Sequence, residues 1–472
     1  MPVPVISVAQ MRAWEQATWA SGQAETTVIA RVGHCLAQRA LALTRHDDSI
    51  LLLTGRGHNG DDARAMLPHL AGRQARLLQV IDPVLALAEL DHSLASGPKL
   101  IVDGLFGIGL NRELDRPWTE FIARVNEARL PVLAVDVPSG LDADTGKSWP
   151  TSIRATFTAT VGAPKRGLLA PEAVENVGRL EVMTEVGLLP CPVQAGEQWT
   201  LPTDFESFPP PRPVTSHKGT FGHLAIVAGS LGYHGASVLA ARSAQRARPG
   251  LITLFTQPDI YHPVAAQLQA VMVHPWKNDV NLSPFTGLLF GPGLATKPVA
   301  ESIRPALAQL WNTAPVPVIV DASALDWLPP TPEPIPFCRV ITPHPGEAAR
   351  LLSCTTAAVQ SDRPAAVRAL SRRYGNCWVV LKGHQTLIGR SEGELWINSS
   401  GHAGLAQGGT GDLLAGFLAG WLAQSWLQND PVRALRYAVW EHGAAADRLS
   451  TRRENWIVEE LADELGANSG RR

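Results

Sequence analysis

Short runs of apolar residues recur along the chain, and longer stretches with helical spacing of apolar residues lie between them. Runs of this length that are apolar at almost every position are typical of strands buried on both faces. Such strands, alternating with helices, form parallel sheets that helices cover on both sides. The pattern therefore predicts an α/β fold with strands at residues 49–54, 75–82, 99–103, 130–136, 223–229, 250–256, 286–291, 316–321, 338–344 and 377–383.

A proline-rich segment, residues 208–219 (FPPPRPVTSHKG), interrupts this pattern. Proline clusters break helices and strands alike, and the stretches on either side each resemble a complete α/β unit. The length of 472 residues also exceeds one ordinary core, since domains average roughly 150 residues. We therefore predict two domains, residues 1–207 and residues 208–472.

The composition favours small-molecule ligands over nucleic acid or membrane partners. Charged residues make up 18% of the chain and the formal net charge is -2, so no basic surface for nucleic acid is expected. The five cysteines include no CxxC pair, which is typical of a reducing compartment. The N-terminus has no basic start followed by an apolar run, so we expect no secretory signal and a cytoplasmic location. Nothing in the sequence requires or excludes a homo-oligomer.

The most membrane-like stretch, Leu413 to Leu427, is too short to cross a bilayer and contains Gln424 and Ser425. A transmembrane helix takes roughly 20 apolar residues. We expect a buried core helix here. The GxxxG spacing of Gly416 and Gly420 predicts that another helix packs closely against it.

A glycine-rich loop follows the first predicted strand. Gly55, Gly57 and Gly60 match the G-x-G-x-x-G pattern of dinucleotide-binding loops, but Asp61 and Asp62 stand where a helix N-terminus would meet the phosphates. Two carboxylates at that place repel phosphate. An ordinary pyrophosphate cradle is therefore not expected, and for Asp61 a role as a helix N-cap is as consistent with the pattern as a role in a site.

Three polar residues of the N-terminal domain lie just past the ends of predicted strands, where parallel sheets bind ligands. They are Asn59, Asp103 and Ser139. Their amide, carboxylate and hydroxyl oxygens are of the kind that bind a hard cation. One aspartate past a strand is usually a cap, but three such loops in one small domain favour a site.

The motifs GRGHNGDDA, VDGLFGIGLNRE, VDVPSGLDADTG and TVGAPKRGLL, in this order, closely resemble the NAD(P)H-hydrate epimerase family. The resemblance implies a Rossmann-like three-layer domain that inverts the hydrated carbon of damaged nicotinamide cofactors. It also implies K⁺ on Asn59, Asp103 and Ser139, and proton transfer by Asp136 and Lys165. The substrate contacts that it implies are His58, Asn59, Gly60, Asp61, Asp62, Gly107, Ile108, Gly109, Leu110, Asn111, Arg112 and Asp136.

The chain departs from that family in the glycine-rich loop, where NNGGDG is usual and residues 58–63 read HNGDDA. His58 can still donate a hydrogen bond. Asp61 adds charge and bulk where glycine allows the backbone to approach closely. The sequence therefore leaves open how much epimerase activity the altered loop keeps.

In the C-terminal domain, the segment 401–420 (GHAGLAQGGTGDLLAGFLAG) places glycines and one aspartate before an apolar helix. Unpaired N–H groups at a helix N-terminus bind anions, so residues 408–411 (GGTG) predict a phosphate cradle. A carboxylate beside bound phosphate is repelled unless it accepts a proton. Asp412 is therefore a candidate general base for attack on a phosphoryl group, although an isolated GTGD is equally consistent with a simple cap.

Two further strand ends carry polar residues, Lys382 in VVLKGHQTLI and His344 with Glu347 in ITPHPGE. With GPGLA (291–295), VDASALDWL (320–328) and segment 216–250, these motifs resemble the ADP- or ATP-dependent NAD(P)H-hydrate dehydratase family, which has a ribokinase-like α/β fold. The resemblance implies that Asp412 takes the proton of the hydrate's hydroxyl group, and Glu347 is expected beside Mg²⁺. It implies nucleotide contacts at Lys382, Gly383, His384, Gln385, Thr386 and Gly411, and hydrate contacts at Ala236, Gly293, His344 and Asp412.

Together the two resemblances imply a bifunctional enzyme that epimerises the R and S hydrates of NADH and NADPH and dehydrates the S form with ADP or ATP. One alternative is a ribokinase-like kinase of a vitamin precursor or sugar, with a non-catalytic N-terminal binding module. Another is a scaffolding role for the N-terminal domain. The sequence does not decide between ADP and ATP, or between NADH and NADPH hydrates.

Overall fold

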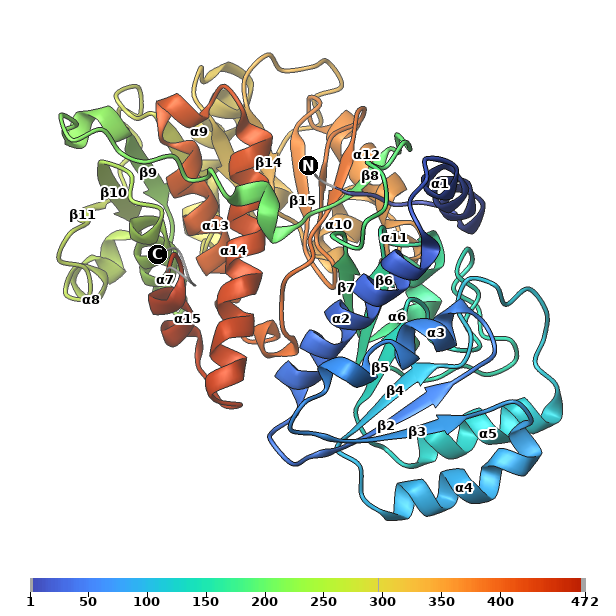
Figure 1. The fold of residues 1–472 in the computed structure, drawn as a ribbon. Coiled ribbons are helices and arrows are strands. Elements are labelled where there is room, and N and C mark those ends of the chain that lie inside the picture. The colour runs from blue at the N-terminus through green and yellow to red at the C-terminus, as the bar shows by residue number, and fades with distance from the viewer. Residues whose placement is uncertain (1–2, 296, 468–472) are drawn as a thin grey trace. The chain divides into compact units, whose positions relative to one another are not determined.

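The computed structural model describes residues 3–295 and 297–467, and it divides into two compact units, one from Val3 to Ala195 and one from Gly196 onward (Figure 1). Each unit is built around its own sheet. The units divide ahead of the proline-rich segment 208–219, because strand β8 (Glu197–Trp199) pairs with β17 (Leu395–Ile397) in the later unit.

The sheet of the N-terminal unit has the strand order β3-β2-β4-β5-β6-β7, and each neighbouring pair is parallel. Helices α4 (Pro83–Ala95) and α5 (Arg116–Glu127) bury one face of it, while α2 (Glu25–Leu43) and α3 (His58–Arg64) pack together on the other (Figure 1). Helix α1 (Val8–Ala20) precedes them in the chain. The strands are β2 (Ser49–Thr54), β3 (Gln74–Gln79), β4 (Leu100–Gly104), β5 (Val132–Val135), β6 (Phe157–Val161) and β7 (Arg179–Met183).

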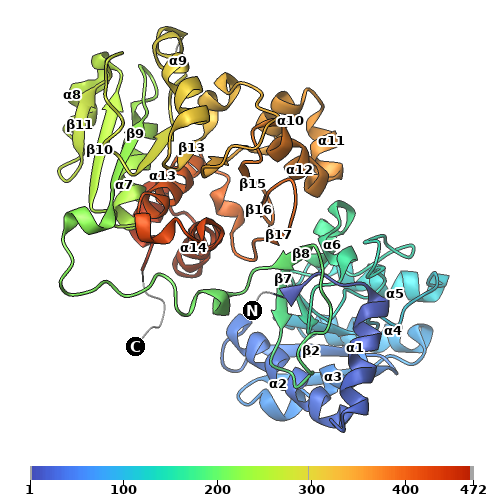
Figure 2. The ribbon, with the colours of Figure 1, turned by 90° about the horizontal axis from the view of Figure 1, so that it is seen from above.

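The sheet of the C-terminal unit runs in the order β8-β17-β16-β15-β14-β13-β12-β9-β10-β11. Helices α7 (His234–Arg246), α13 (Thr410–Leu422) and α14 (Pro431–Arg452) bury one face. Helices α9 (Lys297–Thr313), α10 (Pro345–Leu352) and α12 (Arg363–Arg373) lie on the other (Figure 2). The remaining strands are β9 (His223–Val227), β10 (Leu251–Thr256), β11 (Met272–Pro275), β12 (Gly287–Phe290), β13 (Val318–Val320), β14 (Arg339–Ile341), β15 (Trp378–Leu381) and β16 (Leu387–Gly389).

Every strand predicted from an apolar run is present, and each pairs in parallel with a neighbour. The fold class predicted for both units is therefore confirmed. The pattern missed β6, because Thr158 and Thr160 interrupt its apolar run; both are buried, and the Thr158 hydroxyl donates to the carbonyl of Val177 at 2.7 Å. It also missed the strands β7, β8, β11, β16 and β17. Of these, β16 is antiparallel to both of its neighbours.

Helix α13 is the buried core helix predicted for the membrane-like stretch. It packs along α7, and the spacing of Gly416 and Gly420 allows the two helix backbones to approach closely. A Cβ atom on Gly416 would lie 2.0 Å from the carbonyl oxygen of Ala240, and one on Gly420 would lie 2.8 Å from that of Ala244. Across the described residues, no helix combines the length and the apolar character that crossing a membrane demands.

Replacing Gly416 with Ala should therefore lower the free energy of unfolding of the C-terminal unit by about 1–3 kcal/mol, because the added methyl group forces the two helices apart. The matched control is Gly235→Ala in α7, where nothing lies within 4 Å of the added Cβ. Thermal unfolding followed by calorimetry should show a lower midpoint for the first variant and an equal or higher one for the second. Equal midpoints for Gly416→Ala and the wild type would contradict the close packing.

Candidate active sites

The three residues predicted to hold a cation do come together in the N-terminal unit. Asp103, the last residue but one of β4, is fully buried. The hydroxyl of Ser139 donates to its Oδ1 at 2.6 Å, and the Ser139 amide donates to its Oδ2 at 2.8 Å. Asn59, in the first turn of α3, donates its amide to the carbonyl of Phe106 at 2.9 Å. The Ser139 hydroxyl lies 3.2 Å from that same carbonyl. The predicted set is thus one cluster, joined through Phe106.

The cluster has the chemistry that a cation requires. Burial raises the pKa of Asp103 to about 6, although hydrogen bonds from Ser139 and Leu105 lower it. Its partners are neutral, so a cation here would favour the ionised carboxylate. Carboxylate, amide, hydroxyl and carbonyl oxygens are hard ligands, and among the described residues no cluster of three His, Cys, Asp or Glu forms a competing site for a transition metal.

Asp136 and Lys165 form a buried ion pair beside this cluster. Lys165 is fully buried and its Nζ donates to Asp136 Oδ1 at 2.6 Å, to the hydroxyl of Thr160 at 3.0 Å and to the carbonyl of Val161 at 2.9 Å. Thr160 and the Val161 amide also donate to Oδ1. Among the described residues, Oδ2 has no hydrogen-bond partner, so this oxygen is available to a ligand. The backbone of Asp136 is left-handed, with φ of 61°, a strain typical of functional positions.

Further carboxylates surround this pair, and the sequence gave no signal for two of them. Burial, together with the charges of Asp136 and Asp61, raises the pKa of Asp62, on α3, to about 8. Burial and Asp136 also raise the pKa of Glu15 on α1. Glu25, at the start of α2, lies 3.2 Å from Nε2 of His58. Glu15 and Glu25 lie in helices ahead of the first motif, where no loop pattern marks them.

Asp61 does not cap α3, because Gly57 occupies the N-cap position. Its carboxylate lies 2.7 Å from the guanidinium group of Arg64, which also donates to the carbonyl of Gly55. The glycine-rich loop is tight because its own backbone packs closely: a Cβ on Gly60 would lie 2.3 Å from the Gly55 carbonyl. Asp61 is therefore accommodated by an ion pair with Arg64 on its own helix, while Gly60 remains essential.

The predicted substrate loop at residues 107–112 borders a cavity of about 210 Å³. Ile108, Leu110 and Asn111 line it, together with Arg12 of α1 and Trp149. The Arg12 guanidinium donates to the carbonyl of Ile108 at 3.2 Å. This part of the predicted loop therefore faces a space large enough for a portion of a ligand. Gly109 and Arg112 do not line the cavity.

In the C-terminal unit, the predicted phosphate cradle leads into the N-terminus of α13. Gly409 is the N-cap, with a left-handed φ of 98°, so Asp412 is not a cap. Thr410 donates its hydroxyl to the carbonyls of Leu405 and Gln407, which fixes the turn. Beneath it, His442 of α14 lies 3.0 Å from the Thr410 carbonyl, and burial lowers its pKa to about 4. His442 is therefore neutral, and its Nε2–H donates to that carbonyl.

Asp412 has no hydrogen bond or ion pair within the described part of the chain. Burial raises its pKa to about 7, as do the carboxylates of Asp321 and Glu347, while the ammonium group of Lys382 lowers it. A carboxylate that takes up a proton near neutral pH suits general-base chemistry.

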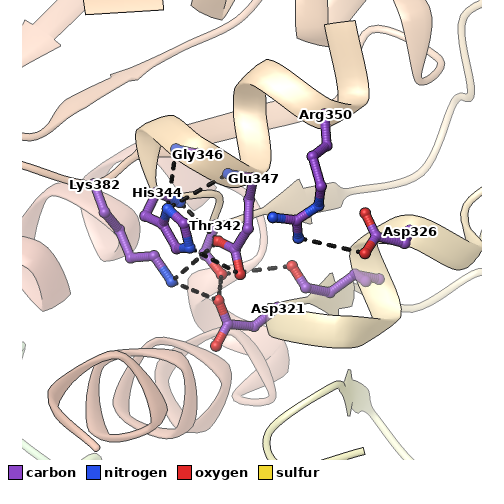
Figure 3. Close-up of polar contacts among 9 residues, drawn as sticks. Asp321, Asp326, Thr342, His344, Gly346, Glu347, Arg350 and Lys382 are labelled. Carbon is purple, nitrogen blue, oxygen red and sulfur yellow. Dashed lines mark hydrogen bonds and ion pairs between the residues drawn. The ribbon is translucent and has the colours of Figure 1, made fainter. Parts of the chain in front are cut away.

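The side chain of Lys382 points toward the carboxylates of Asp321 and Glu347 (Figure 3). Its Nζ lies 2.8 Å from Asp321 Oδ1 and 3.9 Å from Glu347 Oε2. Burial alone would lower the pKa of Lys382, but Asp321 and Glu347 offset this and the pKa is raised. A Cβ on Gly411 would lie 3.4 Å from Nζ, so the ammonium group faces the first turn of α13.

Most of the other predicted contacts lie on loops of the C-terminal unit, and Ala236 lies in the first turn of α7. His344 is the N-cap of α10, and its Nδ1 accepts from the amide of Gly346 at 3.0 Å. Gly293 and Ala236 are neighbours, since a Cβ on Gly293 would lie 2.9 Å from that of Ala236. The loop Gly383 to Thr386 follows β15, and Arg363 of α12 donates to the carbonyl of His384 within it. Sequence reasoning missed Arg363 and did not assign Asp321, although Asp321 ends a predicted strand.

Comparisons with known proteins agree with this division into two sites. Residues 224–468 match the model of a family described as NAD(P)H-hydrate dehydratase, and residues 79–167 match one described as YjeF-related protein N-terminus. The bifunctional NAD(P)H-hydrate repair enzyme Nnr of Gloeobacter violaceus is 33% identical over 95% of this chain and 94% of its own length. The enzyme of the same name from Escherichia coli is 36% identical over 85% of this chain and 81% of its own length.

A solved structure gives the same fold for the later unit. A ribokinase-like superfamily protein from Enterococcus faecalis is 26% identical, with a TM-score of 0.52, and the match covers 58% of this chain and 95% of that one.

The buried Lys165–Asp136 pair predicts a large stability effect. Asp136→Asn should lower the free energy of unfolding of the N-terminal unit by about 3–5 kcal/mol, because it leaves a buried ammonium group without its counter-charge. Adding Lys165→Met should recover part of that loss. The control is Glu120→Gln, which breaks an exposed i,i+4 pair with Arg116 and should leave the urea midpoint nearly unchanged. Additive losses in the double variant would show that the two groups are not coupled.

Proposed function

Because the chain belongs to the family of bifunctional NAD(P)H-hydrate repair enzymes, we propose that its N-terminal unit interconverts the R and S hydrates of NADH and NADPH, and that its C-terminal unit dehydrates the S form. The observation that carries this proposal is the pairing of two separate reaction centres with a family match in each unit. The fusion suits the chemistry, since a dehydratase that accepts one epimer leaves the other behind.

In the N-terminal unit we assign proton transfer to Asp136 and Lys165. Oδ1 of Asp136 is held by three donors, which orients the free Oδ2 toward a ligand. The ammonium group of Lys165 stabilises the carboxylate and can donate a proton next to it. Asp62 is protonated below about pH 8, so it can donate a hydrogen bond to the hydrate's hydroxyl group while Asp136 accepts one. The paired carboxylates thus supply an acid and a base on the same substrate.

We assign K⁺ to Asn59, Asp103 and Ser139, with the carbonyl of Phe106 as a further oxygen. When bound, the ion supplies positive charge that polarises the substrate and keeps Asp103 ionised. The residues themselves hold the three loops in place, because Ser139 bonds both Asp103 and Phe106.

In the C-terminal unit the terminal phosphate of ADP or ATP would rest on the amides at the start of α13, with Lys382 beside it. The hydroxyl oxygen of the hydrate attacks the terminal phosphorus, and Asp412 takes the proton of that hydroxyl group. The remainder of the nucleotide leaves. The new phosphate ester is a good leaving group. Its C–O bond breaks with loss of a ring proton, which releases inorganic phosphate and restores the reduced nicotinamide ring.

Mg²⁺ usually takes one or two carboxylates together with phosphate oxygens and water. Glu347 is the carboxylate that we assign to it. It is buried, and its Oε2 accepts from the amide of His344 at 2.8 Å, so its position is fixed before the nucleotide arrives. When bound, the metal supplies charge that offsets the charge developing on the transferred phosphate.

We also propose a cytoplasmic location. The five cysteines are free thiols, as expected for proteins of reducing compartments.

The general-base role of Asp412 predicts that Asp412→Asn lowers kcat for dehydration of the S hydrate by roughly 10²- to 10⁴-fold, while the affinity for ADP or ATP changes little. In the wild type, kcat/KM should rise with pH through about 7, because only the ionised carboxylate can accept a proton. Nicotinamide absorbance and released phosphate measure both effects. Normal turnover in the variant would remove Asp412 from the mechanism, and a phosphorylated product without reduced cofactor would favour the small-molecule kinase.

The K⁺ assignment predicts that Ser139→Ala raises the K⁺ concentration needed for half-maximal epimerisation by roughly tenfold or more, because one ligand and the link between two loops are lost. Chemical exchange between the hydrate epimers, followed by NMR at increasing KCl with constant ionic strength, measures this. Ser152→Ala is the matched control, since Ser152 is a buried serine outside the cluster. An unchanged K⁺ requirement in Ser139→Ala would refute the assignment.

A further inference from the structure

Asp321 stands at the end of β13 and is almost fully buried, with 1% of its surface exposed. It comes just before a residue with strained backbone, since Ala322 is left-handed with φ of 49°. A buried carboxylate followed by a strained turn costs stability, and such a cost is typical of a functional position.

Three adjacent parallel strands bring the partners of Asp321 to it. Asp321, Thr342 and Lys382 each follow the last residue of their strand, β13, β14 and β15, and these strands are neighbours in the sheet. The Thr342 hydroxyl donates to Asp321 Oδ1 at 2.6 Å, and Lys382 Nζ donates to the same oxygen at 2.8 Å (Figure 3). The carboxylate is therefore fixed from one side by a neutral group and binds the lysine from the other.

Asp321 also sets the electrostatics around the proposed base. The charged groups that face Asp412 are Asp321, Glu347 and Lys382, and His442, beneath the turn, is neutral. Burial has the largest effect on the pKa of Asp412, and the charge of Asp321 has the second largest. Both raise this pKa. A neighbouring negative charge makes a carboxylate a stronger proton acceptor.

Building on the proposed dehydration, we infer that Asp321 is a positioning residue for that reaction: it holds the Lys382 ammonium group at the start of α13 and supplies the negative charge that strengthens Asp412 as a base. Lys382 neutralises Asp321 in turn, so the cradle can still accept a phosphate. No phosphate or substrate contact is required of Asp321 itself.

The test is Asp321→Asn, which keeps the size of the side chain and an oxygen acceptor but removes the charge. We expect kcat for dehydration to fall roughly ten- to a hundredfold. We also expect the rise of kcat/KM with pH to move to lower pH, because Asp412 loses a neighbouring negative charge. A merely structural role would lower the rate without moving this pH profile. The inference is therefore overturned by an unchanged rate, and equally by a lower rate with the wild-type profile.

The matched control is Asp326→Asn. Asp326 lies on the turn that follows Asp321, is exposed, and pairs with Arg350 at 3.3 Å. It should leave both the rate and the pH profile at their wild-type values. A shift as large as that of Asp321→Asn would show that general surface charge, and not Asp321, sets the profile.

Thr342→Val covers the case in which Asp321→Asn does not fold. It keeps the carboxylate and removes only the hydrogen bond that fixes it, so kcat should fall while the affinity for ADP or ATP stays close to the wild type, whereas a merely structural loss would lower both. Wild-type kcat in this variant would overturn the positioning role. If the wild-type protein does not dehydrate the hydrate, the proposed function is wrong. If the wild type is active and Asp321→Asn is unaffected, only this inference is wrong.

Discussion

Both reaction centres depend on a lysine ammonium group that neutralises a carboxylate at the carboxyl edge of a parallel sheet. In the N-terminal unit Lys165 pairs with Asp136 at 2.6 Å, and in the C-terminal unit Lys382 pairs with Asp321 at 2.8 Å. Removing two charges from water is costly, and their attraction offsets this only in good geometry with further hydrogen bonds. Each pair has such bonds, from Thr160 in one and Thr342 in the other. These pairs allow other carboxylates, Asp62 and Asp412, to lie close by with a raised pKa.

The parallel sheets make this arrangement possible. Neighbouring parallel strands end at the same edge, so residues far apart in sequence become adjacent without any local motif. Asp103 and Ser139 meet in this way after β4 and β5, and Asp321 meets Lys382 after β13 and β15. The helices contribute their N-termini: α3 presents Asn59 and Asp62, and α13 presents the amides of the cradle together with Asp412. Close packing of α13 on α7 holds that cradle in place.

The sequence predicted the strands well because buried parallel strands carry an unbroken apolar signal. It missed β6, whose threonines satisfy their hydroxyls internally, and it could not foresee the antiparallel β16. For the sites, the loop motifs predicted Asn59, Asp103, Ser139 and Asp412, and the first three come together in the structure. The sequence could not predict Glu15 and Glu25, because they lie on helices whose sequence shows only ordinary amphipathic spacing. Whether Asp61 caps α3 could be seen only in three dimensions, where Gly57 is the N-cap and Asp61 pairs with Arg64.

Together, the two units would let one chain repair both epimers of a hydrated nicotinamide cofactor. The most direct test is the recovery of nicotinamide absorbance after purified protein, ADP or ATP, Mg²⁺ and K⁺ are added to a mixture of R and S hydrates. We expect the whole mixture to return to reduced cofactor in a single enzymatic phase. Fast recovery of the S fraction followed by a tail at the uncatalysed epimerisation rate would contradict the role of the N-terminal unit, and no recovery with either nucleotide would contradict the account as a whole.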